Sequence, residues 1–403
     1  MGKHLIELFL VTFKLGCTSF GGPTAHIGYF HKEYVKKQKW LSETEFTELV
    51  ALCQALPGPA SSQVGFGVGM LRAGILGGVI SFLGFTLPSF LIMALFVHLI
   101  EFFSPVEAGW IHGLKIVAAA VVYLAISSMA KNFASSKLTG TIALVAAIIM
   151  LLYPSSFTQL TLIVGAAVAG YAFIKIQGSA TPATGFIHVT RRTGWISAAL
   201  FLSILLFLPG LSKGVPGLEL FSDFYRTGSL VFGGGHVVLP LLDQEVVAGG
   251  LVSREAFLAG YGVAQAIPGP LFTFASYLGA AISGWSGAVI TTLAIFLPGF
   301  LLLVAIIPFW GLIRTKAGVQ SAIMGMNAAV VGLLGAAFYD PVLTSSISSS
   351  TDAAFLAGAF CLLSFWKLPP WLVVAAGAGI GQIIFSECVS LASACKQNNG
   401  IFF

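Results

Sequence analysis

Two basic residues stand inside apolar stretches at matching places in the chain. Lys14 and Arg226 each lie six residues before a Phe-Gly-Gly triplet. If these stretches enter a bilayer, a cation at its centre costs about 2.5–3.5 kcal/mol and needs a compensating role. Two cations that approach one site would suit a divalent oxyanion, because guanidinium and ammonium groups both bind such anions. The alternative is anchoring at the membrane surface or, for Lys14, pairing with Glu7.

The first triplet begins the run from Phe20 to His26, which reads Phe-Gly-Gly-Pro-Thr-Ala-His. Each glycine weakens a helix by about 1 kcal/mol, and proline is favoured in the first turn of a new helix. We therefore expect one helix to end near Ser19 and another to start at Pro23, where free N–H groups would suit an anion. The run 232–236 (Phe-Gly-Gly-Gly-His) repeats the break without the proline. The alternative is close helix packing through small residues.

A second break follows in each half of the chain. Gln54 precedes Pro57-Gly58-Pro59 by three residues, and Gln265 precedes Pro268-Gly269-Pro270 in the same way. Each proline costs about 3 kcal/mol inside a helix, so both helices must be interrupted. Polar side chains follow the breaks, which leaves two roles open: contact with a ligand, or a turn whose backbone is capped by the glutamine.

Together these motifs predict a substrate-binding site and the helix breaks that shape it. His26 and His236 are also candidates for proton coupling, because imidazole titrates near neutral pH. They are not equivalent positions, since Thr24 aligns with His236 in the repeat. No Cys-x-x-Cys spacing occurs, and we expect neither a metal nor a cofactor. The predicted binding residues are Lys14, Ser19, Gly21, Gly22, Thr24, Gln54, Ser61, Arg226, Gly233, Gly234, His236, Gln265 and Thr273. The predicted breaks are at Pro23, Pro57, Gly58, Pro59, Pro268, Gly269 and Pro270.

The elements that must position these residues are apolar and duplicated. Hydrophobic residues make up 57% of the chain and charged residues 9%, against roughly 25% charged in soluble domains. The motifs recur in the same order at an offset that drifts from 212 to 209. This is the pattern of an all-α polytopic membrane protein built from two homologous halves, as in secondary transporters. Basic residues are scattered, so no nucleic-acid partner is expected.

The apolar segments number about 13, as six, one and six. We expect a first repeat over 1–176, a linker over 177–194, an extra connecting transmembrane helix over 195–211, a second repeat over 219–388 and a tail over 389–403. An odd segment between the repeats delivers the second copy to the opposite face, so the topology should be inverted. The expected segments are 5–30, 46–71, 74–100, 113–131, 138–153, 158–176, 195–210, 219–241, 256–281, 286–310, 320–339, 353–366 and 370–387.

The charges of two corresponding loops favour this inversion. Lysines 32, 36, 37 and 39 follow the first segment, whereas the matching loop holds Asp243, Glu245 and Glu255 with only Arg254. By the positive-inside rule, the first loop is cytoplasmic and the second is not. Most basic residues fall inside if the first two segments of each half are broken or re-entrant. The N-terminus would then be cytoplasmic and the C-terminus periplasmic. The alternative is that these segments simply cross the membrane.

Enzyme chemistry finds no support, since no GxxxxGK[ST], GxSxG or HExxH motif occurs. Without a phosphate-binding loop, the driving force should be an ion gradient or the membrane potential.

At these paired motifs the chain resembles the chromate ion transporter family, in its long two-domain form. The resemblance rests on Phe13 to Gly16, Phe20 to His26, Gln54 to Pro59 and the return from Gly228 to Pro240. It implies a multi-pass protein of the bacterial inner membrane that exports chromate and confers chromate resistance, with sulfate as the natural competitor. A passive anion channel, transport of another oxyanion such as sulfate, and a membrane-embedded enzyme acting on lipid stay open as alternatives. A homodimer also stays open as the assembly.

Overall fold

The computed structural model describes residues 2–103, 109–175, 189–231, 238–313 and 316–398, and within these ranges it contains helices and no strand. The expectation of an all-α protein is confirmed. The first half contains α1 (Gly2–Thr18), α2 (Gly22–Phe30), η1 (His31–Lys37), α3 (Glu43–Ala55), α4 (Ala60–Phe103), α5 (Gly109–Phe133), α6 (Lys137–Leu152) and α7 (Ser156–Phe173). After α8 (Arg191–Leu211), the second half contains α9 (Pro216–Leu230), α10 (Val238–Leu242), η3 (Asp243–Val247), α11 (Arg254–Ala264), η4 (Leu271–Thr273), α12 (Phe274–Ile306), η5 (Ile307–Phe309), α13 (Trp310–Ile313), α14 (Ala317–Ala337), η6 (Phe338–Leu343), α15 (Thr344–Ser346), α16 (Ser350–Ser364) and α17 (Pro370–Asn398).

Five helical stretches in the described ranges are long and apolar enough to cross a membrane, and four shorter apolar helices accompany them. The chain is therefore a multi-pass membrane protein. The number of 13 segments and the inverted orientation of the halves remain predictions. The five long stretches are Ala60–His98, Gly109–Phe133, Arg191–Leu211, Leu271–Phe309 and Ala317–Ser346.

Two of the long helices fold back on themselves at equivalent places. The backbone of α4 leaves the helical region at Ala73 and Gly74, and α12 does so at Ser283 and Gly284. Both glycines have positive φ angles, 65° and 63°, which favour a residue without a side chain. Each helix is thus a hairpin of a short arm and a long arm. Because the kinks occur 210 residues apart, the repeat extends to the shape of the helices.

The arms of each hairpin touch through glycine. A Cβ atom on Gly69 would collide with the carbonyl oxygen of Gly77 in α4, and one on Gly279 with that of Gly287 in α12. Small residues are the usual means of bringing helix backbones this close in a membrane protein.

The two hairpins also pack against each other, through aromatic rings. Phe66 stacks on Phe300 with ring centroids 4.4 Å apart, and Phe82 lies 5.0 Å from Phe296. The first helix of each half packs on the hairpin of the same half in the same way. Gly16 of α1 lies against the backbone at Phe85, and Gly228 of α9 against that at Ile295.

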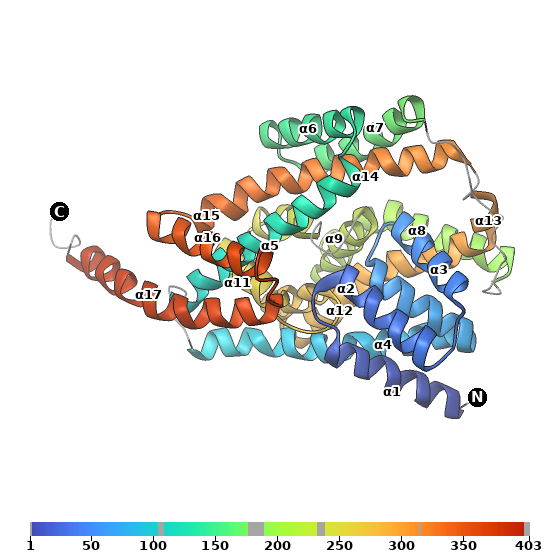
Figure 1. Cartoon of the computed structure of the whole chain (residues 1–403), viewed down its shortest axis with the longest axis horizontal. Coiled ribbons are helices and arrows are strands. Elements are labelled where there is room, and N and C mark those ends of the chain that lie inside the picture. The colour runs from blue at the N-terminus through green and yellow to red at the C-terminus, as the bar shows by residue number, and fades with distance from the viewer. Residues whose placement is uncertain (1, 104–108, 176–188, 232–237, 314–315, 399–403) are drawn as a thin grey trace.

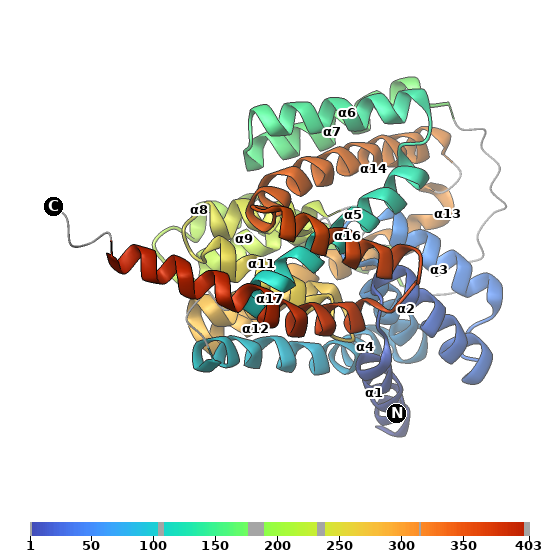
Figure 2. The same cartoon turned by 60° about the vertical axis from the view of Figure 1, so that its left-hand side comes forward.

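The remaining helices of the two halves are exchanged. Helices α6 and α7 of the first half pack against α14 of the second half, and α16 and α17 pack against α5 of the first (Figure 1). Figure 2 shows the same neighbours from another side. Glycine contacts again bring the backbones together, as where Gly170 meets Gly325 and Gly113 meets Gly381. Each half therefore completes its packing only with helices from the other.

Candidate functional site

Two reciprocal hydrogen bonds join the interruptions of one half to those of the other. The Gly58 N–H donates to the Val231 carbonyl oxygen at 2.7 Å, and the Gly269 N–H donates to the Ser19 carbonyl oxygen at 2.9 Å. Val231 and Ser19 each directly precede a Phe-Gly-Gly triplet. Each Pro-Gly-Pro break thus meets the first break of the opposite half, and the interrupted segments come together at one place.

The tips of the Pro-Gly-Pro breaks leave no room for a side chain. Gly58 and Gly269 have φ angles of 115° and 97°. A Cβ atom on Gly58 would lie 2.9 Å from the Cα of Gly299, and one on Gly269 would lie 2.7 Å from Ser89 Oγ. Gly299 and Ser89 lie on the long arms of α12 and α4, so each tip rests on the hairpin of the other half or its own neighbour.

Gln63 holds the first tip in place. Its Nε2 donates to the carbonyl oxygens of Pro57 at 3.0 Å and of Gly299 at 2.9 Å, which links α4 to α12. The side chain is fully buried, and its Oε1 has no hydrogen-bond partner among the described residues. The sequence reasoning did not place Gln63 in the site. Its signal was a glutamine six residues after a proline inside an apolar helix.

A cavity of about 350 Å³ opens beside the first Pro-Gly-Pro break, between α2, α3, α4 and α5. Two predicted binding residues, Gln54 and Ser61, line it, as do the break residues Pro23 and Gly58. Ser128 and Asn132 of α5 add a hydroxyl and an amide that the sequence reasoning missed. They are spaced four residues apart in an otherwise apolar helix, which places them on one face and could have revealed them. The remaining lining residues are Ile27, Cys53, Leu56, Ala60, Met129 and Phe133.

His26 lies behind this cavity, not on its wall. The imidazole is 1% exposed, and its Nδ1 is 3.2 Å from Ser61 Oγ. Phe85 packs edge-on against the ring at a centroid distance of 5.5 Å. The Nε2 atom is buried without a hydrogen-bond partner in the described part of the chain. His26 therefore reaches the cavity through the Ser61 hydroxyl.

The cavity has no equally polar counterpart in the second half. Where the first half has Ala60, Ser61 and Ser128, the repeat places Leu271, Phe272 and Ala337, and all three of these are buried. Bulky apolar side chains thus occupy the space that is open and polar in the first half.

Lys14 and Arg226 lie apart from the lining of the cavity, each beside a carboxylate. Lys14 Nζ is 3.6 Å from Glu33 Oε2, and Arg226 Nη2 is 2.5 Å from Glu245 Oε2. Arg226 also lies 3.5 Å from Asp223. The partner of Lys14 is therefore Glu33, not Glu7. Both carboxylates belong to π-helical turns at equivalent positions, η1 and η3.

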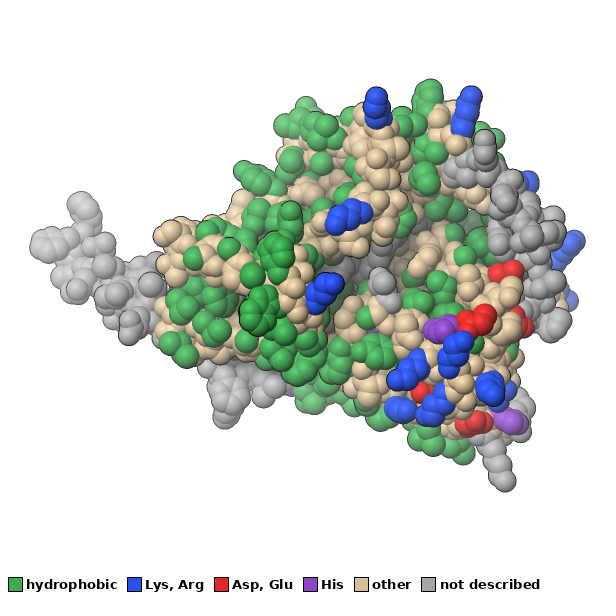
Figure 3. Space-filling view, viewed as in Figure 1, with side chains coloured by type: hydrophobic (Ala, Val, Ile, Leu, Met, Phe, Trp, Pro, Cys, Tyr) green, Lys and Arg blue, Asp and Glu red, His purple; other side chains and the backbone are tan. Residues whose placement is uncertain are grey.

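Glu33 collects several donors at the end of the first hairpin. Burial raises the pKa of its carboxyl, but hydrogen bonds from Gln38 and Lys37 and the charge of Lys14 outweigh burial and hold the pKa below its usual value. Basic side chains gather over η1 and the start of α3 (Figure 3), where lysines 32, 36, 37 and 39 are exposed.

The other predicted binding residues are placed as follows. Ser19 is buried with an unpartnered hydroxyl, and Gln265 Nε2 is buried without a partner in the described ranges. The Thr273 hydroxyl donates to the Pro270 carbonyl oxygen at 2.7 Å. Gly21 and Gly22 form the left-handed turn between α1 and α2, with φ angles of 92° and 77°, and Thr24 follows in α2. Gly233, Gly234 and His236 lie outside the described residues. No group of His, Cys, Asp and Glu in the described ranges could hold a metal ion.

Duplicated membrane helices that are interrupted around a buried polar cavity define the class of membrane transport proteins. The chain belongs to the chromate transporter family, whose sequence profile matches residues 6–171 and 218–382. These two matches also establish the two repeats.

Relatives of known name agree with this membership. The chain is 30% identical over 406 residues to a probable chromate transport protein of Synechococcus elongatus, with 96% of both chains covered. It is 28% identical over 391 residues to a chromate transport protein of Pseudomonas aeruginosa, covering 94% of this chain and 92% of the relative. The uncharacterized transporter YwrB of Bacillus subtilis is 27% identical over 194 residues, which are 98% of its length and 47% of this chain. No solved structure matches the chain.

Proposed function

We propose that the protein is a secondary transporter that exports chromate, or a sulfate-like divalent oxyanion, across the bacterial inner membrane and so confers chromate resistance. The family and the names of the relatives support the substrate. The observation that carries the proposal is the polar cavity at the meeting point of the helix breaks. Its amide and hydroxyl groups can donate hydrogen bonds to an oxyanion at the place where the halves join.

The outward direction follows from charge. The lysine-rich turn near the cavity attracts dianions, and the positive-inside rule places it in the cytoplasm. The corresponding turn of the second half is acidic and disfavours re-entry. With an interior-negative potential, outward movement of a dianion is favourable by about 4.6 kcal/mol per 100 mV, twice the value for one charge. The membrane potential can therefore drive export.

We place the anion between the two halves of an inverted repeat. Gln54 and Ser61 would contact it directly, with Ser128 and Asn132 as further donors. Lys14 and Arg226 would steer it from their carboxylate partners, and His26 would move protons through Ser61. The equivalent breaks at Gly233, Gly234 and Gln265 would complete the site once the opposite face opens.

Transport in oriented membrane vesicles tests this function. We expect everted vesicles to take up chromate when the potential is positive inside the vesicle, with sulfate as a competitor. Imposed pH gradients at constant potential separate proton coupling from electrical driving. An ohmic current without saturation would show an anion channel instead, and the absence of chromate and sulfate movement would refute the proposal.

Cysteine labelling tests the inverted topology. In a background without the native cysteines, Lys36→Cys should react from the cytoplasmic side and Glu245→Cys from the periplasmic side, because their turns differ in charge. Reaction of both from the same side would exclude the inverted arrangement.

A further inference from the structure

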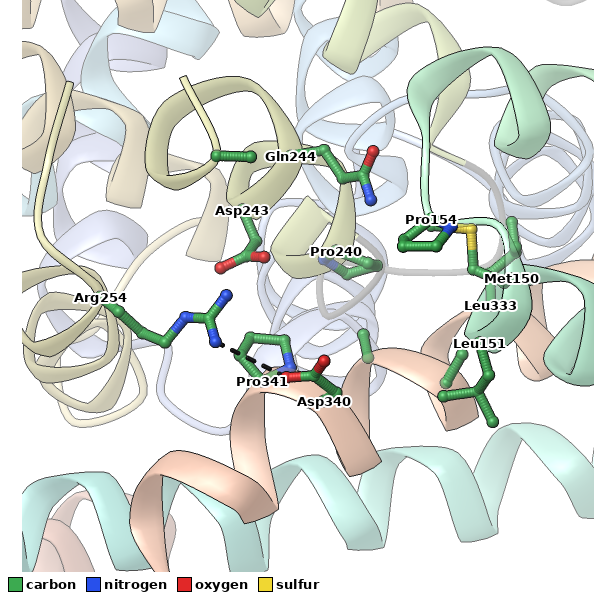
Figure 4. Close-up of a pocket in the computed structure, with 13 residues that line it drawn as sticks. Met150, Leu151, Pro154, Pro240, Asp243, Gln244, Arg254, Leu333, Asp340 and Pro341 are labelled. Carbon is green, nitrogen blue, oxygen red and sulfur yellow. Dashed lines mark ion pairs between the residues drawn. The ribbon is translucent and has the colours of Figure 1, made fainter. Parts of the chain in front are cut away.

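A second cavity, of about 240 Å³, lies at the other mouth of the molecule (Figure 4). Residues from α6, α10, η3, α11, α14 and η6 surround it. Its charged lining consists of Asp243, Arg254 and Asp340, and Gln244 adds an amide. None of these four residues has a role in the proposed binding of the oxyanion.

Asp243 is the unusual member of this group. Its side chain is 9% exposed, and its Oδ1 atom is buried without a hydrogen-bond partner in the described ranges. In Figure 4 its carboxyl group points into the cavity, toward Arg254 and Asp340. An ionised carboxylate that is buried without hydrogen bonds is costly, whereas its protonated form is much less so. The site is therefore built to hold a proton.

The charged groups that face Asp243 come from two other elements. Arg254 of α11 lies with its Nη1 3.6 Å from Asp340 Oδ1 of η6, and Asp340 is largely exposed. Asp243 itself belongs to η3, outside every stretch that could span the membrane. Burial raises the pKa of its carboxyl to about 6, the guanidinium of Arg254 opposes this rise, and the charge of Asp340 adds to it.

The equivalent positions in the first half carry different side chains. The repeat aligns Asp243, Arg254 and Asp340 with His31, Glu43 and Lys131. Glu43 pairs with His31 at 2.6 Å and with Lys36, and no ion pair joins it to Lys131 in the described part of the chain. The tie between the re-entrant helix and the long helix is therefore made at one mouth and open at the other.

The packing of the re-entrant helices differs in the same sense. Helix α11 packs on α5, where a Cβ atom on Gly262 would lie 3.0 Å from the Leu114 carbonyl oxygen. Its counterpart α3 has no comparable contact with α14 in the described ranges and lines the open polar cavity instead.

We propose that Asp243 is a proton-binding site whose occupancy controls how firmly Arg254 ties η3 and α11 to η6. With Asp243 ionised, the guanidinium is shared between two carboxylates and the three elements are held together. With Asp243 protonated, only the pair with Asp340 remains and η3 is released. That this mouth faces outward rests on the topology proposed above, whereas the binding of the proton does not.

Spin-label distances test the site without any transport measurement. The full chain, with its native cysteines replaced, would carry labels at Leu251→Cys and Tyr339→Cys, two exposed positions beside the cavity. We expect the distance between the labels to increase as the pH falls through about 6, the pKa of Asp243. In Asp243→Asn, which is neutral at every pH, the distance should stay at its low-pH value.

Two further variants shift the midpoint in opposite directions. Asp340→Asn removes a negative neighbour and should lower the midpoint, whereas Arg254→Gln removes a positive neighbour and should raise it. Glu255→Gln, an exposed change next to Arg254 that does not line the cavity, is the matched control and should leave the midpoint in place. A distance that does not change with pH, or a change that persists in Asp243→Asn, overturns the proposal. So does a midpoint that fails to move in both Asp340→Asn and Arg254→Gln. Because no oxyanion is present, these outcomes are independent of the transported substrate.

Discussion

Lys14 lies 3.6 Å from Glu33, and Arg226 repeats this relationship with Glu245 at 2.5 Å. In both pairs the acid follows the base by 19 residues and belongs to a π-helical turn. The duplication therefore preserved an ion pair and not a single charge. A carboxylate in this position competes with an incoming oxyanion for the same cation.

Removal of the competing carboxylate should strengthen binding of the anion. We expect Glu33→Gln and Glu245→Gln to improve the apparent affinity for chromate by up to about fivefold, the equivalent of roughly 1 kcal/mol for a partly exposed pair. Initial rates over a range of chromate concentrations measure this effect. Glu43→Gln, which frees Lys36 away from both pairs, is the control. A weaker affinity in the two test variants would mean that the carboxylates only position the cations.

Removal of the cations should have the opposite effect. Lys14→Gln and Arg226→Gln should weaken the apparent affinity, and the loss should grow with ionic strength because salt screens the remaining attraction. Lys14→Arg should be milder than Lys14→Gln, while Arg226→Lys should still be harmful because lysine lacks the planar fork. Unchanged affinity at normal membrane levels of both glutamine variants would reduce these residues to anchors.

The helix breaks should be needed for transport but not for insertion. Pro57→Ala and Pro268→Ala should reach the membrane and transport poorly, because alanine favours a continuous helix. Gly269→Ala adds a clash with Ser89 to the strain of a positive φ, so it should cost more stability than Gly214→Ala, where the φ is 81° and the space is open. Thermal unfolding in detergent and export assays measure both effects. Normal export in both proline variants would show that the breaks have no role in transport.

Apolar bulk at the cavity should block it. Ser61→Phe places at this position the residue that Phe272 provides in the other half, and we expect export to fall more than tenfold as the cavity fills. Ser61→Ala should mainly weaken affinity, by about 1 kcal/mol for one hydrogen bond. Ser62→Ala, a buried change outside the cavity lining, is the control. Full export by Ser61→Phe would exclude the cavity from the transport path.

The raised pKa of Asp243 predicts how stability depends on pH. Burial raises this pKa from 3.8 to about 6, so folding favours the protonated form and stability is lost as the pH rises through about 6. Asp243→Asn avoids that loss. Its melting temperature should exceed that of the wild type above pH 6, and the difference should shrink as the pH falls toward 4. A difference that is constant across this range would contradict the raised pKa.

Much of the architecture could be predicted from the sequence, because Gly and Pro interrupt apolar runs by local rules. The kinks at Gly74 and Gly284 were not foreseen as sharp hairpins, although they fall between predicted segments. The exchange of α6 and α7 with α16 and α17 could not be read from a pattern, since small residues permit close packing without naming the partner.

The site was predicted in part. Gln54 and Ser61 line the cavity because they flank a recognisable break. Asn132 was missed because it lies more than 70 residues away on α5, and only the fold brings it close. The partner of Lys14 was also unavailable to local reasoning, since Glu33 belongs to the next helix and Glu7 seemed nearer in the chain.

The exchanged helices impose an order on biosynthesis. Helices α6 and α7 are finished before their packing partner α14 exists, and about 160 residues must follow, which takes roughly ten to thirty seconds at ordinary synthesis rates. During this interval their contact faces have only lipid or the insertion machinery as neighbours. The first half therefore matures only when the ribosome has nearly completed the second, and a nascent chain that stalls between the halves should be a target for membrane proteases.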